Sequence, residues 1–192
     1  MEYISTRNTQ KTFSFKDVFL KGLAPDGGLF VPKKIPLYTS QELEKLRNLS
    51  YNELATKIIL KFCSDEFDEI EIKDLVKNSY KNFRVNDVVV IKKLGKVNLL
   101  ELFHGPTLAF KDIAMQVIGN MYEKILEKNN LKVNIVVATS GDTGAAAISA
   151  IRDRKNMKIF VLHPDNKISE VQRKFMTTVN SSNVFNIALA GN

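Results

Sequence analysis

The most constraining feature of the sequence is an alternation of strand-like and helix-like segments in its second half. A β-branched run at 133–138 and strand-like runs at 158–162 and 184–189 are separated by helical patterns at 145–154 and 169–179. Short apolar runs of this kind are typical of strands buried in parallel sheets. Strands that alternate with helices indicate right-handed crossovers in an open α/β sheet. We therefore predict an open, mostly parallel sheet with helices on both faces, incomplete in this chain.

The first part of the chain has a different, mainly helical pattern. Thr39 and Ser50 are each followed three residues later by glutamate, which is the capping-box signature of a helix start. We expect helices near 40–47, 51–63 and 70–80, after a short one within 13–20. The predicted organisation is a mainly helical N-terminal region at residues 1–86, followed at 87–192 by the first part of an α/β domain.

Composition excludes several classes of protein. The net charge of +7 comes from lysines dispersed among acidic residues, a pattern typical of a solvated surface and not of a nucleic-acid interface. No apolar run approaches the length of a membrane span. The single Cys63 cannot form an internal disulfide, and no cysteine–histidine cluster indicates a metal site. We expect a cytoplasmic protein without nucleic acid, membrane or metal partners.

A lysine near a helix start is the first candidate for chemistry. Strands are expected at 88–91 and 97–103 with Gly95 in the turn between them, and Pro106 suits the first position of the next helix. Lys111 would then lie in the first turns of that helix, where the positive end of the helix dipole disfavours its ammonium form. A neutral lysine amine is what Schiff-base chemistry requires.

Periodicity alone leaves other interpretations open. A lysine beside an apolar helix face commonly extends to solvent, and Lys111 fits that interpretation too. His104, in the turn before the helix, is compatible with a structural role or a catalytic one. His163 follows a strand and either lines the same crevice or closes it.

A second candidate is the loop at residues 139–144, Thr-Ser-Gly-Asp-Thr-Gly, between a predicted strand and helix. Small and hydroxyl residues at a helix start allow backbone N–H groups to converge on an anion, and open α/β sheets bind ligands at the carboxyl ends of their strands. The loop lacks the P-loop pattern and the dinucleotide fingerprint. Its spacing fits a ligand loop or a tight structural turn equally well.

Three separated motifs resemble the threonine synthase family of pyridoxal-phosphate enzymes, whose fold is of the tryptophan-synthase-β type. They are Leu-Phe-His-Gly-Pro-Thr-Leu-Ala-Phe-Lys-Asp at 102–112, Ala-Thr-Ser-Gly-Asp-Thr-Gly-Ala-Ala at 138–146, and Gly-Leu-Ala-Pro-Asp-Gly-Gly-Leu-Phe-Val-Pro at 22–32. They occur in family order across essentially the whole chain. The resemblance implies conversion of O-phospho-L-homoserine and water to L-threonine and phosphate, the last step of threonine biosynthesis.

The resemblance also implies roles for individual residues. Lys111 would hold the cofactor aldehyde and move protons, and it is the catalytic residue that we expect. The expected cofactor-binding residues are Lys111, Phe110 and Asp142; the expected substrate-binding residues are Thr139, Ser140, Gly141, Thr143 and Gly144. At residue 142, relatives on this fold usually place asparagine, whereas aspartate is found in threonine synthases.

The family's glycine-rich loop for the cofactor phosphate has no counterpart here. We therefore expect the chain to be the N-terminal part of a longer protein and to be inactive on its own. Two other functions remain open, a different pyridoxal-phosphate elimination or replacement enzyme such as a serine/threonine dehydratase, and a non-catalytic ligand-binding module. The sequence does not indicate an oligomeric state.

Overall fold

The computed structural model describes residues 1–191, and the chain divides into two compact units, Met1–Lys77 and Asn78–Asn192. Helix α4 (Glu69–Tyr80) contains the boundary between the units. The division of domains after residue 86 stays a prediction. Within residues 1–191, no helix is both long enough and apolar enough to cross a membrane.

The first unit combines a small antiparallel sheet with helices. The sheet has the strand order β2–β1–β3. Its strands are β1 (Tyr3–Ser5), β2 (Thr12–Phe13) and β3 (Phe30–Pro32). The helices before α4 are α1 (Phe15–Lys21), α2 (Ser40–Leu46) and α3 (Tyr51–Cys63). The predicted helices are confirmed, whereas most of the small sheet was not predicted.

Both predicted capping boxes are present. The Thr39 hydroxyl accepts from the Glu42 amide while the Glu42 carboxylate accepts from the Thr39 amide, and Ser50 and Glu53 form the same pair at the start of α3. Each box satisfies two backbone N–H groups that a helix start leaves without partners. The local sequence therefore determines where α2 and α3 begin.

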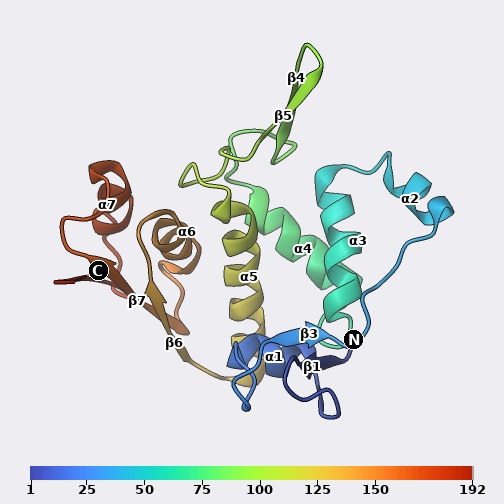
Figure 1. Ribbon diagram of the computed structural model, residues 1–192, viewed down its shortest axis with the longest axis horizontal. Coiled ribbons are helices and arrows are strands. Elements are labelled where there is room, and N and C mark those ends of the chain that lie inside the picture. Colours follow the sequence, from blue (N-terminus) through green and yellow to red (C-terminus); the bar gives the residue numbers. More distant parts are fainter. Residues whose placement is uncertain (192) are drawn as a thin grey trace. The chain divides into compact units, whose positions relative to one another are not determined.

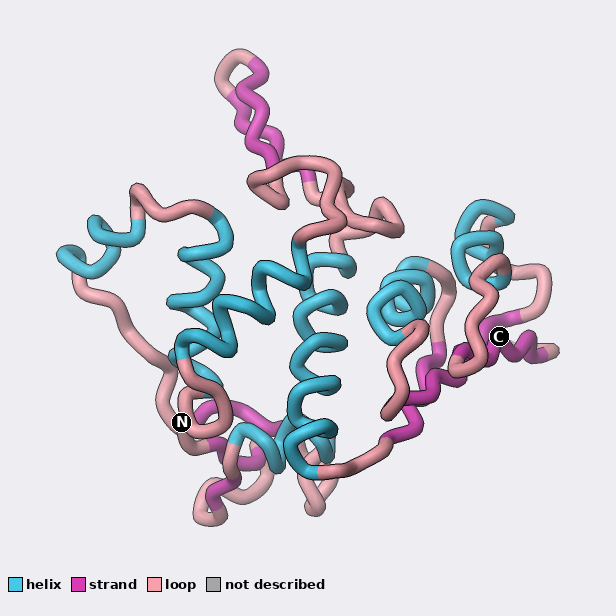
Figure 2. The backbone as a smooth tube through the Cα atoms, turned by 180° about the vertical axis from the view of Figure 1, so that it is seen from behind, coloured by secondary structure: helices cyan, strands magenta, loops and turns pink. Residues whose placement is uncertain are grey.

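The second unit starts with the end of α4 and a hairpin (Figures 1 and 2). The hairpin consists of β4 (Val90–Leu94) and β5 (Val97–Glu101), which pair antiparallel across the predicted Gly95 turn. The prediction began the first strand at Val88, which was wrong. Val88 has a φ of 61°, outside the extended region, and its side chain is buried.

The rest of the second unit is the predicted alternation of helices and strands. Its elements are α5 (Lys111–Asn129), β6 (Val133–Ala138), α6 (Asp142–Ile151), β7 (Met157–Pro164), α7 (Glu170–Thr177) and β8 (Val184–Leu189). The strands form a parallel sheet of order β6–β7–β8. The predicted open parallel α/β sheet is confirmed.

Helices α6 and α7 lie on one face of this sheet (Figure 1). Val161 of β7 is in register with Asn186 of β8, so the two side chains share a face. Val161 packs beside Gly144 of α6, and the Asn186 amide donates to the Met176 carbonyl of α7 at 3.0 Å. The crossovers β6–α6–β7 and β7–α7–β8 therefore place their helices on the same face of the sheet.

Within the described part of the second unit, the opposite face of the sheet is not covered by a helix. Phe160 and Phe185 stack on it with ring centroids 4.8 Å apart, and Val136 beside them is 66% exposed. The predicted helices on both faces are thus present on one face only. The consecutive strand order explains this, because successive right-handed crossovers in one direction place their helices on the same side.

Candidate active site

Lys111 is the first residue of α5, and Phe110 occupies the N-cap position. The helix was predicted to begin at Pro106, which was wrong because Leu108 adopts a φ of 63° and interrupts the helical backbone. The Lys111 side chain is half-buried, and its Nζ lies 4.7 Å from the centroid of the Phe110 ring. This cation–π contact places the amine next to the helix start.

The start of α5 is organised by Asp112 and not by its N-cap residue. Phe110 makes no capping hydrogen bond through its side chain. The fully buried Asp112 carboxylate instead accepts from the Thr107 amide at 2.8 Å and from the Thr107 hydroxyl at 2.7 Å. A Cβ on Gly105 would lie 2.4 Å from the Asp112 Cβ, so glycine is required there. These contacts fix the turn that precedes Lys111.

His104 is held by a buried carboxylate at the end of β5. Its Nε2 lies 2.9 Å from Glu101, whose second oxygen accepts from Lys92 Nζ at 2.6 Å. The hydrogen bond from Lys92, followed by that from His104, holds the pKa of Glu101 below its usual range. The side chain of Glu101 is only 6% exposed. The contact with Glu101 therefore fixes the orientation of the His104 ring.

The loop 139–144 connects β6 to α6 and is built around one hydroxyl. The Thr139 oxygen accepts from the Gly141 amide at 3.1 Å and from the Gly144 amide at 3.2 Å. Gly141 has a φ of 149°, a conformation that favours glycine. A side chain on Gly144 would collide with Thr139 and Met176. The loop thus depends on its glycines and on Thr139.

Asp142 and Thr143 form the first turn of α6, where backbone amides have no partners within the helix. The exposed Asp142 carboxylate accepts from Gln172 Nε2 of α7 at 2.9 Å. Ser140 is exposed beside it. The loop therefore presents amides and hydroxyls at the positive end of a helix dipole, an arrangement that attracts an anion.

Two cavities lie beside these elements. One of about 340 Å³ is bordered by Pro106 and Thr107 of the turn before Lys111 and by Ala145 and Ser149 of α6. The other, of about 320 Å³, lies at the carboxyl ends of the three strands; it is lined by Ala138, Thr139, Ser140, Leu162, His163, Pro164 and Leu189. The first cavity shows that the turn before Lys111 and the helix after the loop approach each other.

Comparisons with known proteins point to one family. A family model described as the threonine synthase N terminus matches residues 2–80. Threonine synthase from Pseudomonas aeruginosa is 44% identical over 193 residues, and the alignment covers all of this chain and 41% of that protein. The crystal structure of pyridoxal-phosphate-bound threonine synthase from Brucella melitensis superposes on the whole chain with a TM-score of 0.93 at 40% identity, over 42% of its own chain.

The chain matches the N-terminal portion of threonine synthases. It spans about two fifths of the length of the relatives it matches. The yeast threonine synthase structure gives the same result, with a TM-score of 0.93 at 39% identity over 41% of that chain. The similarity thus extends over both units of this chain and over the N-terminal portion of each threonine synthase.

The structure places the predicted site residues in two groups. Phe110 and Lys111 lie at the start of α5, and the predicted substrate residues Thr139, Ser140, Gly141, Thr143 and Gly144 lie with Asp142 in the loop before α6. The Lys111 amine lies against the ring of Phe110. The roles of these residues stay predictions. His163 is buried and lines the cavity at the strand ends.

Sequence reasoning missed two residues that build this part of the threonine synthase fold. Asp112 fixes the turn before Lys111, and Gln172 binds Asp142 from α7. The aspartate was visible in the motif, but its hydrogen bonds to Thr107 depend on non-helical backbone around Leu108, where a helix was predicted. Ser169 and Gln172 have capping-box spacing, which indicates the start of α7 and not the contact to the loop.

Proposed function

We propose that the complete protein is a threonine synthase that converts O-phospho-L-homoserine and water to L-threonine and phosphate with pyridoxal 5′-phosphate as cofactor. The observation that carries the proposal is the match over the whole chain to a relative whose structure is described as bound to pyridoxal phosphate. In class the protein would be a carbon–oxygen lyase acting on phosphate. The proposal includes a cytoplasmic location and a part in threonine biosynthesis.

The residues present fit this cofactor. The Lys111 amine is half-buried at a helix start and lies against the aromatic ring of Phe110. A primary amine in this position suits a covalent bond to an aldehyde. Lys111 would hold the cofactor, Phe110 would contact it, and Asp142 would face it. When bound, the cofactor supplies an electron-withdrawing ring that stabilises negative charge on substrate carbons.

The protein's own residues account for substrate binding and proton movement. The first-turn amides of Asp142 and Thr143, with the hydroxyls of Thr139 and Ser140, would bind the substrate carboxylate. The Lys111 Nζ would carry protons between Cα, Cβ and Cγ. Phosphate leaves from Cγ, and water adds its hydroxyl at Cβ, so that the atoms of substrate and water appear in threonine and phosphate.

The decisive experiment uses the complete gene product. We expect phosphate release from O-phospho-L-homoserine with formation of L-threonine, and borohydride reduction followed by peptide mapping should place the cofactor label on Lys111. Lys111→Ala should abolish both signals. Lys124→Ala, an exposed lysine on the same helix, is the matched control and should change neither.

Other outcomes separate the alternatives. Consumption of serine or threonine without phosphate release from O-phospho-L-homoserine would indicate a dehydratase. Absence of label on Lys111 in the complete gene product would indicate a non-catalytic binding module. Residues 1–192 alone should bind the cofactor weakly and release no phosphate; an absorbance band of bound cofactor that survives dialysis of this chain, together with turnover, would contradict that expectation.

A further inference from the structure

Helices α5 and α6 meet at a close contact between Gly119 and Ala150. A Cβ on Gly119 would lie 2.7 Å from the Ala150 carbonyl oxygen and 3.2 Å from the Ala150 Cβ. Both residues are buried. Because no side chain separates the two backbones here, the helices can tilt about this point unless other contacts prevent it.

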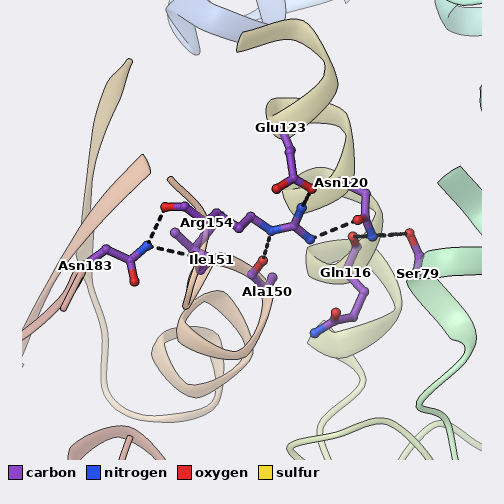
Figure 3. A network of polar contacts seen from close by, with 8 residues as sticks. All are labelled: Ser79, Gln116, Asn120, Glu123, Ala150, Ile151, Arg154 and Asn183. Atoms are coloured by element: carbon purple, nitrogen blue, oxygen red, sulfur yellow. Dashed lines mark hydrogen bonds and ion pairs between the residues drawn. The ribbon is translucent and has the colours of Figure 1, made fainter. Parts of the chain in front are cut away.

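Arg154, in the turn after α6, joins the two helices (Figure 3). Its guanidinium forms an ion pair with Glu123 of α5 and donates to Asn120 Oδ1 at 2.9 Å. The Nε donates to the Ala150 carbonyl at 2.7 Å, at the C-terminal end of α6. The side chain is 14% exposed, and burial lowers the pKa of the guanidinium, an effect that Glu123 opposes. The planar guanidinium group of Arg154 therefore binds both α5 and α6.

Further hydrogen bonds fix both ends of this connection (Figure 3). Asn120 donates through its amide to Ser79 Oγ at 2.9 Å, within the same unit. The Asn183 amide donates to the Ile151, Arg154 and Met157 carbonyls at 3.0, 3.1 and 2.9 Å. The turn that carries Arg154 is thus attached to the sheet, and its partner on α5 is attached to α4.

The two groups of predicted site residues lie at the starts of these helices. Lys111 precedes Gly119 by eight residues, and Asp142 precedes Ala150 by eight. At 1.5 Å per residue, each helix start lies about 12 Å from the contact point, so a tilt of about 5° moves it by about 1 Å. A displacement of about 1 Å in an active site can reduce the rate by about 10²-fold.

We propose that Arg154 is a positioning residue, which sets the angle between α5 and α6 and thereby the position of Lys111 relative to the loop 139–144. This rests on the proposed function, in which Lys111 and that loop act on one substrate. The Glu123 side chain is 39% exposed, and an ion pair with a solvent-exposed partner adds little to stability. The planar guanidinium group of Arg154, however, binds several partners in one defined geometry. Geometry is therefore the property that Arg154 supplies.

The first test is steady-state kinetics of the complete gene product. Arg154→Met should lower kcat for phosphate release by about 10- to 100-fold, with KM changed by less than about threefold. Arg154→Lys keeps the charge but loses the planar guanidinium group, so its kcat should be intermediate. Gly119→Ala disturbs the same contact without changing a charge and should also lower kcat. Lys155→Met, at an exposed lysine next to Arg154, is the matched control and should have no effect.

A second measurement does not depend on activity. Cys63 is buried, so spin labels attached at Ala114→Cys and Ser140→Cys report the distance between the two helix starts in the chain itself. Arg154→Met should shift or broaden the distance distribution, and Lys155→Met should leave it unchanged. Ile159→Val, in the middle of the sheet, lowers stability without touching Arg154 and should also leave the distribution unchanged.

These measurements separate the two hypotheses. If the parent protein releases no phosphate, the proposed function fails, whereas the distance distributions still decide the role of Arg154. If Arg154→Met lowers the melting temperature but leaves kcat and the distance distribution unchanged, Arg154 only stabilises the fold and the inference is overturned.

Discussion

The substitution Asp112→Asn tests how the start of α5 is held. Asp112 is fully buried, and its two oxygens accept from the amide and the hydroxyl of Thr107. Asparagine has the same shape but only one acceptor oxygen, and its NH₂ group is a donor. The hydroxyl of Thr107 can rotate to accept, but its backbone amide cannot. One of the two contacts must therefore be weakened or replaced.

The size of the effect follows from these contacts. A hydrogen bond to a charged group contributes about 1.5–3 kcal/mol to the free energy of unfolding. The loss of one such contact at a fully buried site should cost about 2 kcal/mol. For a chain of this length, 1 kcal/mol corresponds to about 2–4 °C in melting temperature. We expect a decrease of about 4–8 °C.

Thermal and urea unfolding of the chain, followed by circular dichroism, measure this effect. Asp87→Asn, at an exposed aspartate of the same unit, is the matched control and should shift the melting temperature by no more than about 1 °C. In a double-mutant cycle with Thr107→Val, the combined loss should be smaller than the sum of the single losses. Unchanged stability of Asp112→Asn, or strict additivity, would refute the proposed organisation of this turn.

Two further predictions concern pH. Burial raises the pKa of Cys63 and that of Tyr3, each to about 12, above the values of about 8.5 and 10 for the unfolded chain. Their contribution to the free energy of unfolding is therefore fully present below the pKa values of the unfolded chain and is lost as the pH rises towards 12. Urea unfolding should show this loss of stability at high pH, and the loss should be smaller in Cys63→Ala. For Glu101, the hydrogen bond from Lys92 lowers the pKa, so its contribution is present above about pH 4.3 and is lost as the pH falls. Glu101→Gln should make unfolding less sensitive to acid between about pH 5 and 3, and an unchanged acid profile would contradict this.

Local signals in the sequence were sufficient for the main elements. The mostly apolar run 184–189 was predicted with the bounds that β8 has, because a short apolar run after a helical segment indicates a strand of a parallel sheet. The capping boxes located the starts of α2 and α3. In both cases the residues that determine the structure are neighbours in the chain.

The features that were not predicted depend on residues distant in the chain or on unusual backbone conformations. Strand β1 pairs with β3 across about 25 residues, and each strand has only three. The start of α5 was misplaced because Leu108 adopts a positive φ, which an apolar residue does not signal. The ion pair of Arg154 with Glu123 joins two elements whose crossing point follows from packing alone.

The two helix starts of the candidate site are built by different means, and this decides what each can offer to a ligand. At α5, the Asp112 carboxylate is occupied by Thr107, so the available group is the Lys111 amine. At α6, the Thr139 oxygen accepts two amides, so its own O–H is left as a donor. An anion at this loop would thus take hydrogen bonds from hydroxyls and from the remaining first-turn amides, while a carbonyl group would be captured at Lys111. This division of roles between an amine and an anion site is what an enzyme needs in order to bind an amino acid by its carboxylate while reacting at the neighbouring carbons.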